Sequence, residues 1–199
     1  MNHPATPSPS VILCGADGEA IGYLPKDQVH HRDTPLHLAF SSYIFDSDRR
    51  LLVTRRSSAK ATWPGVTTNS CCGHPEPEEP LTDAVRRRVH EELGVKAENI
   101  TLVLPTFSYR AQMPNGIVEY ELCPVFTATA ESTTLQADPE EVDGAEWIPW
   151  HSFATRVCDG TLEVSPWCRM QVEQLVELGP DPLRWAAGDP TQLPAAATY

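Results

Sequence analysis

Basic side chains are scarce in this chain, which has 15 lysines and arginines against 27 aspartates and glutamates and a formal net charge of −12. Domains that bind duplex nucleic acid are usually basic, so this balance argues against nucleic acid as a partner. An acidic protein can still bind an anionic ligand if it gathers its few cations, or a metal ion, at one site. The positions of the scarce lysines and arginines are therefore informative.

Long apolar runs are also missing, because no stretch reaches the roughly 18 residues that a membrane-spanning helix needs. Residues 1–10 hold proline, serine and threonine but neither a basic segment nor an apolar one, so they do not predict a secretory signal. We therefore expect a cytoplasmic protein without a membrane partner. The core pattern leaves no further apolar stripe, which favours a monomer.

Paired Cys-x-x-Cys motifs are the third absence, and this argues against a structural zinc ribbon. The chain has six cysteines, of which only Cys71 and Cys72 are adjacent, and neighbours in sequence are poorly placed to bridge one another. Reduced thiols are the default in a cytosolic chain. For most of these cysteines we expect a small buried apolar role.

The clearest secondary-structure pattern lies at residues 78–93. Leu81, Val85 and Val89 recur at helical spacing and form one apolar stripe, and Gly94 is a stop signal. We expect a helix over this range. Apolar and alternating segments predict strands at 10–14, 20–24, 36–45, 50–55, 100–104, 117–126 and 145–148, and helices at 25–29, 150–157 and 166–178.

A length of 199 residues fits one domain with a real core. Strands on both sides of a central helix, with further helices near the end, predict an α+β fold, an α/β/α sandwich with a mixed sheet. The polar segment 127–139 is expected to be a loop. We expect a flexible arm at 1–9, a single domain at 10–179 and a proline-rich tail at 180–199, as surface coil or partly disordered.

Two glutamates and three histidines are candidate metal ligands. Glu119 and Glu121 lie two apart on an expected strand, so they share a face. That face could meet solvent or arginines instead, and a lone histidine is more often structural. His30, His37 and His74 together with two carboxylates would suit a divalent ion. The five residues lie on three segments, so their spacing alone cannot show that they meet.

A thiol and a basic cluster add candidate chemistry. Cys72 stands two residues before His74, so in an extended segment both face the same way. A thiol beside a cationic site could ionise readily and act as a base or nucleophile, although a buried inert thiol is the alternative. Arg55, Arg56 and Lys60 could be a solvated edge or a phosphate clamp.

Residues 73–95 resemble the Nudix box. Gly73, Glu79 and Arg87 match its pattern, and so does the run Glu91-Glu92-Leu93-Gly94-Val95. The departure is Arg88, where the box has glutamate. In Nudix hydrolases that glutamate belongs to the carboxylates that hold the catalytic Mg²⁺, so its loss argues against pyrophosphate hydrolysis.

Five further segments are similar to type 1 isopentenyl-diphosphate delta-isomerases, which belong to the Nudix superfamily. They are residues 33–42, 68–75, 109–111, 116–124 and 165–167, in matching order, within a resemblance that covers roughly residues 10 to 180. The resemblance implies a Nudix fold and interconversion of isopentenyl and dimethylallyl diphosphate through a carbocation, in isoprenoid biosynthesis. The family usually has tryptophan where this chain has Thr67.

The resemblance also implies roles for the matching residues. Cys72 and Glu121 would be the catalytic pair, with Tyr109 assisting Glu121. Glu92 would hold a Mg²⁺ that also meets the substrate diphosphate. The implied ligands of one tightly bound divalent metal, Mn²⁺ or Zn²⁺, are His30, His37, His74, Glu119 and Glu121. The residues implied to contact substrate are Arg56, Lys60 and Arg88 at the diphosphate and Trp167 at the hydrocarbon.

Two other functions remain open at this point. A Nudix hydrolase acting on a nucleoside diphosphate derivative is the first, and Arg88 argues against it. The second is a catalytically inactive Nudix-fold binding module, which would not need Cys72, Glu121 and three histidines together. Trp167, too, could be plain core packing rather than a substrate contact.

Overall fold

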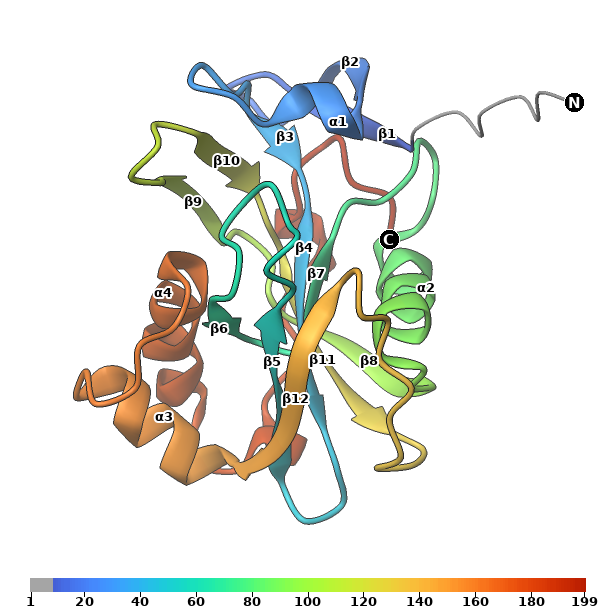
Figure 1. Cartoon of the computed structure of the whole chain (residues 1–199). Helices are drawn as coiled ribbons and strands as arrows, with labels where there is room; N and C mark the ends of the chain where they lie inside the picture. The colour runs from blue at the N-terminus through green and yellow to red at the C-terminus, as the bar shows by residue number, and fades with distance from the viewer. Residues whose placement is uncertain (1–8) are drawn as a thin grey trace, which may run out of the picture.

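The protein is described by a computed structural model that covers residues 9–199, so all of the expected N-terminal arm except Pro9 lies outside the described residues. A seven-stranded sheet forms the centre (Figure 1), in the order β12-β5-β4-β11-β8, with β6 beside β5 and β7 beside β4. Its strands are β4 (Phe40–Phe45), β5 (Arg50–Arg56), β6 (Thr67–Thr68), β7 (Cys71–Gly73), β8 (Ala97–Leu104), β11 (Val125–Ala130) and β12 (Val142–Pro149).

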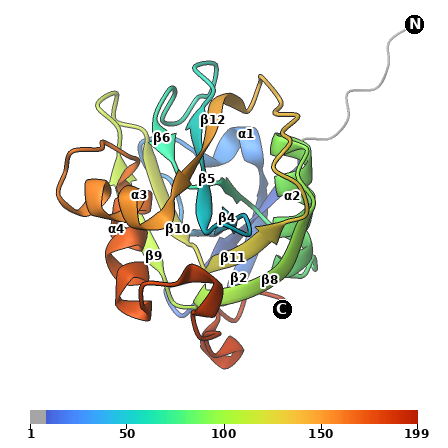
Figure 2. The same cartoon turned by 90° about the horizontal axis from the view of Figure 1, so that it is seen from below.

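Helices cover both faces of this sheet. One face carries α2 (Leu81–Leu93), and the other carries α3 (Trp150–Cys158) and α4 (Pro166–Leu175), as Figures 1 and 2 show. The side chains of β4 alternate between the two cores. Tyr43 and Phe45 pack on the α3–α4 side, and Phe40 and Ile44 pack on the α2 side.

The expected fold class is therefore confirmed: the three layers form an α/β/α sandwich. The central sheet is mixed, because β4 and β11 run parallel while β11 and β8, and β5 and β12, run antiparallel. Among residues 9–199, no helix combines the length and apolar character needed to cross a membrane.

A second sheet of five strands lies at one end of the sandwich, in the order β2-β1-β3-β10-β9. The strands expected at 10–14 and 20–24 are present and form an antiparallel hairpin, β1–β2. The short helix α1 (Lys26–Val29) follows the hairpin. The strands are β1 (Ser10–Cys14), β2 (Ala20–Pro25), β3 (His37–Leu38), β9 (Ser108–Gln112) and β10 (Val118–Leu122).

Two neighbouring segments pass from the five-stranded sheet into the seven-stranded one. β3 continues into β4 after Ala39, and β10 continues into β11 after Cys123 and Pro124. Both pairs run parallel, and Ala39 N–H donates to Leu122 O at 2.9 Å between them. The prediction of unbroken strands at 36–45 and 117–126 was therefore wrong, since the first segment changes sheets at Ala39 and the second at Cys123 and Pro124.

Other boundaries differ for local reasons. The expected loop at 127–139 begins as strand, because Thr127 pairs with Tyr43 on one side and Thr101 on the other. Helix α2 starts at Leu81 rather than at residue 78, since Glu78 has a φ of 67° that no α-helix accepts. At the other end of the domain, α4 stops at Leu175 and a 3₁₀ turn, η1 (Val176–Leu178), completes the expected range.

The segment after residue 179 is coil with two 3₁₀ turns, η2 (Pro182–Arg184) and η3 (Pro190–Gln192), and it lies against the domain. Gly188 N–H donates to the backbone oxygen of Leu102 at 2.8 Å. Thr198 O accepts from Leu81 N–H at 2.8 Å. This contact satisfies one of the backbone donors that a helix start leaves free, so the tail is attached to α2.

Gly94 ends α2 in a left-handed conformation, with a φ of 64°. An added Cβ would lie 2.6 Å from Gln136 Cβ, so Gly94→Ala is expected to lower the unfolding free energy by about 2 to 4 kcal/mol. Urea unfolding would measure this. Gly160→Ala is the matched control, because Gly160 has a φ of 78° and no described atom within 4 Å of the added Cβ. Equal losses in the two variants would contradict the role given to Gln136.

Candidate active site and metal centre

A cavity of about 340 Å³ opens where the two sheets meet. Of the site residues that the family resemblance implies, all except His37 and Arg88 line it. Arg55 of the basic cluster lies outside the cavity and pairs with Asp143. The five-stranded sheet supplies the carboxylates through β10, and the seven-stranded sheet supplies Cys72 through β7. The sheet crossing therefore brings together side chains that lie far apart in the chain.

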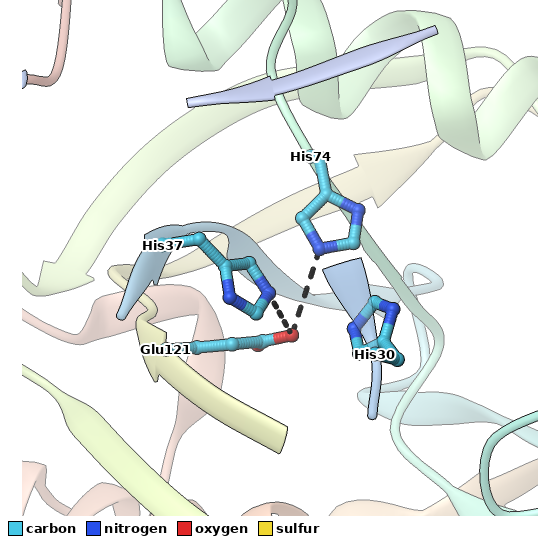
Figure 3. A group of neighbouring side chains, drawn as sticks. All are labelled: His30, His37, His74 and Glu121. Carbon is cyan, nitrogen blue, oxygen red and sulfur yellow. Dashed lines mark ion pairs between the residues drawn. The ribbon is translucent and has the colours of Figure 1, made fainter. Parts of the chain in front are cut away.

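Three histidines and one glutamate converge on a single point (Figure 3). The ligand atoms of His30, His37, His74 and Glu121 all lie within 4.8 Å of one another. Glu121 Oε1 is 3.4 Å from His37 Nε2 and 3.6 Å from His74 Nε2. The parallel pairing of β3 with β10 places His37 directly beside Glu121, and His74 follows β7.

The free atoms of this group fit a divalent ion. His37 Nδ1 lies 2.9 Å from Pro35 O, which fixes the proton there and leaves Nε2 as a lone pair. Among residues 9–199, His37 Nε2 and both ring nitrogens of His74 are buried without a hydrogen-bond partner. Two ligands about 2.1 Å from a tetrahedral ion stand roughly 3.4 Å apart, close to the separations seen here.

The charge states of His30, His74 and Glu121 suit the same role. Burial lowers the pKa of His30 to about 3 and that of His74 to about 4, so both rings are neutral at pH 7. Burial opposes ionisation of Glu121, but the neighbouring rings of His37 and His74 hold its pKa well below the usual value. Burial likewise opposes a charge on His37, yet Glu121 raises its pKa.

Glu119 lies on the same face of β10, as the two-residue spacing predicted, but outside the group of four converging residues. It is buried, and its Oε2 accepts a hydrogen bond from the Tyr109 hydroxyl at 2.9 Å. Burial and then the charge of Glu121 raise the pKa of Glu119 to about 7. The sequence-based expectation paired Tyr109 with Glu121, whereas in the structure the Tyr109 hydroxyl contacts Glu119.

Cys72 faces the cavity from the other side. Its Sγ lies 3.2 Å from Ser41 Oγ and donates to Asn69 Oδ1 at 3.3 Å. Burial raises the pKa of the Cys72 thiol to about 12, so the side chain is protonated at neutral pH. Of the two alternatives that the sequence left open, the buried protonated thiol is the one that this geometry favours.

One cavity thus holds a thiol, a carboxylate and a cluster of histidines. Comparison of the whole chain with known proteins identifies its family. The NUDIX domain family matches residues 35–178. The isopentenyl-diphosphate Delta-isomerase of Rhizobium rhizogenes is 57% identical over 198 residues, which is 99% of this chain and 95% of that protein. This chain belongs to the isopentenyl-diphosphate Delta-isomerase family. The Saccharopolyspora erythraea member is 52% identical over 187 residues, 94% of this chain and 96% of that one.

Solved structures agree with the NUDIX fold of this isomerase family member. A crystal structure of a Deinococcus radiodurans protein superimposes with a TM-score of 0.62 at 19% identity, covering 83% of this chain and 98% of that one. A MutT NUDIX hydrolase from Burkholderia pseudomallei gives a TM-score of 0.54 at 24% identity, covering 70% and 98%. At these identities the likeness concerns the fold alone.

Two arginines in the NUDIX motif segment of this isomerase family member lie outside the cavity and pair with glutamates near it. Arg87 forms a two-pronged ion pair with Glu79, with Nε at 2.7 Å from Oε1 and the Nη2 nitrogen at 2.6 Å from Oε2. Since Glu79 precedes α2, this pair fastens the loop after His74 to the helix. Arg88, the departure from the motif, pairs with Glu92 at 2.5 Å and with Glu141 at 3.2 Å.

Cationic side chains gather at one end of the cavity, where Arg56, Lys60 and Lys26 line it. Arg56 donates to Thr62 O at 3.0 Å, and its guanidinium carbon stands 5.7 Å from the Trp167 ring centre. Lys60 pairs with Glu141, and burial lowers the pKa of Lys60 to about 8. The sequence reasoning missed Lys26, which lines the cavity from α1. The scarcity of lysine in this acidic chain was the only signal for it.

The remaining wall is aromatic. Trp167 of α4 is buried, and its ring centre stands 5.7 Å from that of Tyr109. Its indole N–H donates to Asn69 Oδ1 at 3.1 Å, which fixes the ring at the cavity edge. The cavity thus has a cationic end, a side formed by histidines and carboxylates, and an aromatic wall next to Cys72.

Proposed function

We propose that this protein interconverts isopentenyl diphosphate and dimethylallyl diphosphate, in isoprenoid biosynthesis. The observation that carries the proposal is one cavity lined by Cys72 and Glu121 in a chain 57% identical over nearly its full length to an isopentenyl-diphosphate Delta-isomerase. The reaction adds a proton to one carbon of an alkene and removes another proton two bonds away. An unactivated alkene is a weak base, so the proton donor must be well placed.

Cys72 and Glu121 are the proposed proton-transfer pair. They reach the cavity from β7 and β10, which belong to different sheets. One residue can therefore donate a proton to one carbon of the flat alkene while the other removes a proton from a second carbon. Cys72 holds a proton at Sγ, and Glu121 is a carboxylate. The reaction is reversible, so each group donates in one direction and accepts in the other.

Tyr109 and Trp167 are proposed to protect the tertiary carbocation between the two proton transfers. Their rings form a wall that excludes water from the reacting carbons. An indole face near a desolvated cation contributes about 2 kcal/mol. The hydroxyl of Tyr109 also holds Glu119 in place beside the catalytic carboxylate.

The charged end of the cavity is the proposed diphosphate site. Arg56, Lys60 and Lys26 would contact the diphosphate, with Arg88 assisting, and Glu92 would hold a Mg²⁺ that also meets it. When bound, the second divalent ion, Mn²⁺ or Zn²⁺, supplies positive charge that orients Glu121 and strengthens it as a proton donor. The proposed ligands of this ion are His30, His37, His74, Glu119 and Glu121.

The proposal is tested by incubation with isopentenyl diphosphate and Mg²⁺ in D₂O. Dimethylallyl diphosphate carrying deuterium is the expected product, because the proton that is added comes from an exchangeable group. Phosphate release from a panel of nucleoside diphosphate derivatives, with no isomerisation, would favour the hydrolase instead. Binding without turnover of either substrate class would favour an inactive binding module.

We further propose that the enzyme acts as a cytoplasmic monomer whose one domain spans residues 10–179. All six cysteines are free in the structure, which suits a reducing compartment. The partner is then the small isoprenoid diphosphate alone, with neither nucleic acid nor a membrane surface. Light scattering at micromolar concentration would measure the mass of the particle.

A further inference from the structure

A buried chain of hydrogen bonds runs from α4 through β4 to the sulfur of Cys72. Tyr43 donates to Gln171 Oε1 at 3.0 Å, and Gln171 Nε2 donates to Ser41 Oγ at 2.8 Å. Ser41 Oγ lies 3.2 Å from Cys72 Sγ, the only one of these side chains that lines the cavity. Tyr43, Gln171 and Ser41 are fully buried.

On the side of the Cys72 sulfur away from Ser41, the neighbouring atom is Asn69 Oδ1, which can only accept a hydrogen bond. Asn69 Nδ2 donates to the backbone oxygens of Ser42 and Cys71, at 3.0 and 3.2 Å, so Oδ1 must point towards Cys72. The indole N–H of Trp167, which can only donate, confirms this orientation by its 3.1 Å contact with the same Oδ1. The Cys72 S–H therefore donates to Asn69.

Because the Cys72 hydrogen is used by Asn69, the contact between Ser41 and Cys72 requires the Ser41 hydroxyl to be the donor. Gln171 Oε1 accepts from the Tyr43 hydroxyl, which also lies 3.7 Å from Cys168 Sγ, and the Gln171 amide nitrogen faces Ser41 and donates to it. Ser41 accepts that hydrogen bond, so its own hydrogen is left for a sulfur neighbour. Two sulfurs are within reach, Cys72 at 3.2 Å and Cys123 at 3.4 Å, and Cys72 is the nearer.

We propose that Ser41 is a positioning residue for Cys72, because the Tyr43–Gln171–Ser41 chain aims a hydroxyl hydrogen at the sulfur and holds it at the cavity wall. This inference rests on the proposed function, in which Cys72 exchanges a proton with substrate. The S–H must leave Asn69 to reach a substrate carbon, and the bond from Ser41 keeps the sulfur in place while it turns. Ser41 itself never contacts the substrate.

The position of Ser41 in the fold supports this role. β7 pairs antiparallel with β4, and Ser41 and Cys72 are direct partners in the register. The next residue, Ser42, is equally buried but points to the opposite face, where its hydroxyl donates to Cys71 O at 3.0 Å. Substitution by alanine removes one buried hydroxyl from either serine, but only the Ser41 hydroxyl contacts the Cys72 thiol.

Ser41→Ala and Ser42→Ala therefore form a matched pair for the test. Ser41→Ala is expected to lower kcat for isopentenyl diphosphate by about 10- to 100-fold, since small misplacements of a reacting group cost this much, with KM within about twofold. Ser42→Ala should keep kcat within about threefold. Equal losses in the two variants, a loss confined to KM, or wild-type kcat in Ser41→Ala would each overturn the proposal.

A second variant decides the matter if Ser41→Ala does not fold. Gln171→Met keeps the size of the side chain but no longer directs the Ser41 hydroxyl, so kcat should fall several-fold at constant KM. Unchanged kcat in Gln171→Met would then overturn the proposal. Failure of the wild-type protein to isomerise isopentenyl diphosphate would reject the proposed function instead, so the two failures are distinguishable.

Discussion

Cys72→Ala is expected to abolish isomerisation, with kcat lower by at least about 10³-fold, while the fold is retained. The variant removes the proton carried at Sγ on one side of the cavity, and general acid–base groups contribute about 10²- to 10⁴-fold. Turnover of isopentenyl diphosphate, followed by product analysis, measures the loss. Cys158→Ala is the control, because Cys158 is an exposed cysteine at the end of α3, and its kcat should equal that of the wild type.

Cys72→Ser separates the position of the group from its chemistry. A serine hydroxyl can accept from Ser41 and donate to Asn69 as the thiol does, so the local contacts survive. A hydroxyl gives up its proton far less readily than a thiol, and we expect the variant to be inactive as well. Turnover close to that of the wild type in either Cys72 variant would reject the proposed catalytic pair.

Glu121→Gln is expected to lose both activity and bound metal. The carboxylate is the negative charge that faces His37 Nε2 and His74 Nε2, and a neutral amide provides only a weak ligand in its place. We expect kcat to fall by about 10³-fold and the tightly bound metal, measured by elemental analysis of the purified protein, to fall well below one equivalent.

Glu98→Gln is the control for this second variant. Glu98 is also a strand glutamate, but it lies on β8 and pairs with Lys96 at the surface, so metal content and activity should not change. Full metal content together with full activity in Glu121→Gln would contradict the proposed role of that carboxylate. Loss of metal with activity retained would separate the ligand role from proton transfer.

Local pattern was enough to predict much of the fold. The apolar stripe of Leu81, Val85 and Val89 predicted the face that α2 buries, and all three side chains are fully buried. Alternation put Glu119 and Glu121 on one face of β10, where they both lie. Such periodicities are set by the backbone geometry of one segment, so the sequence contains them directly.

The breaks in the strands were not predictable in the same way. Ala39 and Cys123 lie within apolar runs that would suit one continuous strand each. The two runs lie side by side and pair in both sheets, so they change sheets together. This pairing joins segments more than 80 residues apart in the sequence. The strand at Thr127–Ala130 was missed for the same reason, since a central position between β4 and β8 outweighs a polar composition.

The site needed the resemblance as well as the pattern. Nothing in their spacing brings His30, His37 and His74 to Glu121, because the meeting depends on β3 lying beside β10 and on where β7 ends. The protonation of Cys72 follows from burial, which only the folded chain defines. Tyr109 likewise pairs through its backbone with Glu121 but places its hydroxyl on Glu119.

The double sheet crossing has a consequence for which changes of chain length the protein can tolerate. Ser41 lies four positions after His37, and Val125 lies four positions after Glu121. His37 is the parallel partner of Glu121, and Ser41 is that of Val125. Deleting one residue in either stretch would shift the register and turn a proposed metal ligand, or Ser41, to the wrong face. Insertions and deletions should be rare there among functional relatives and common in the exposed turn at 47–49.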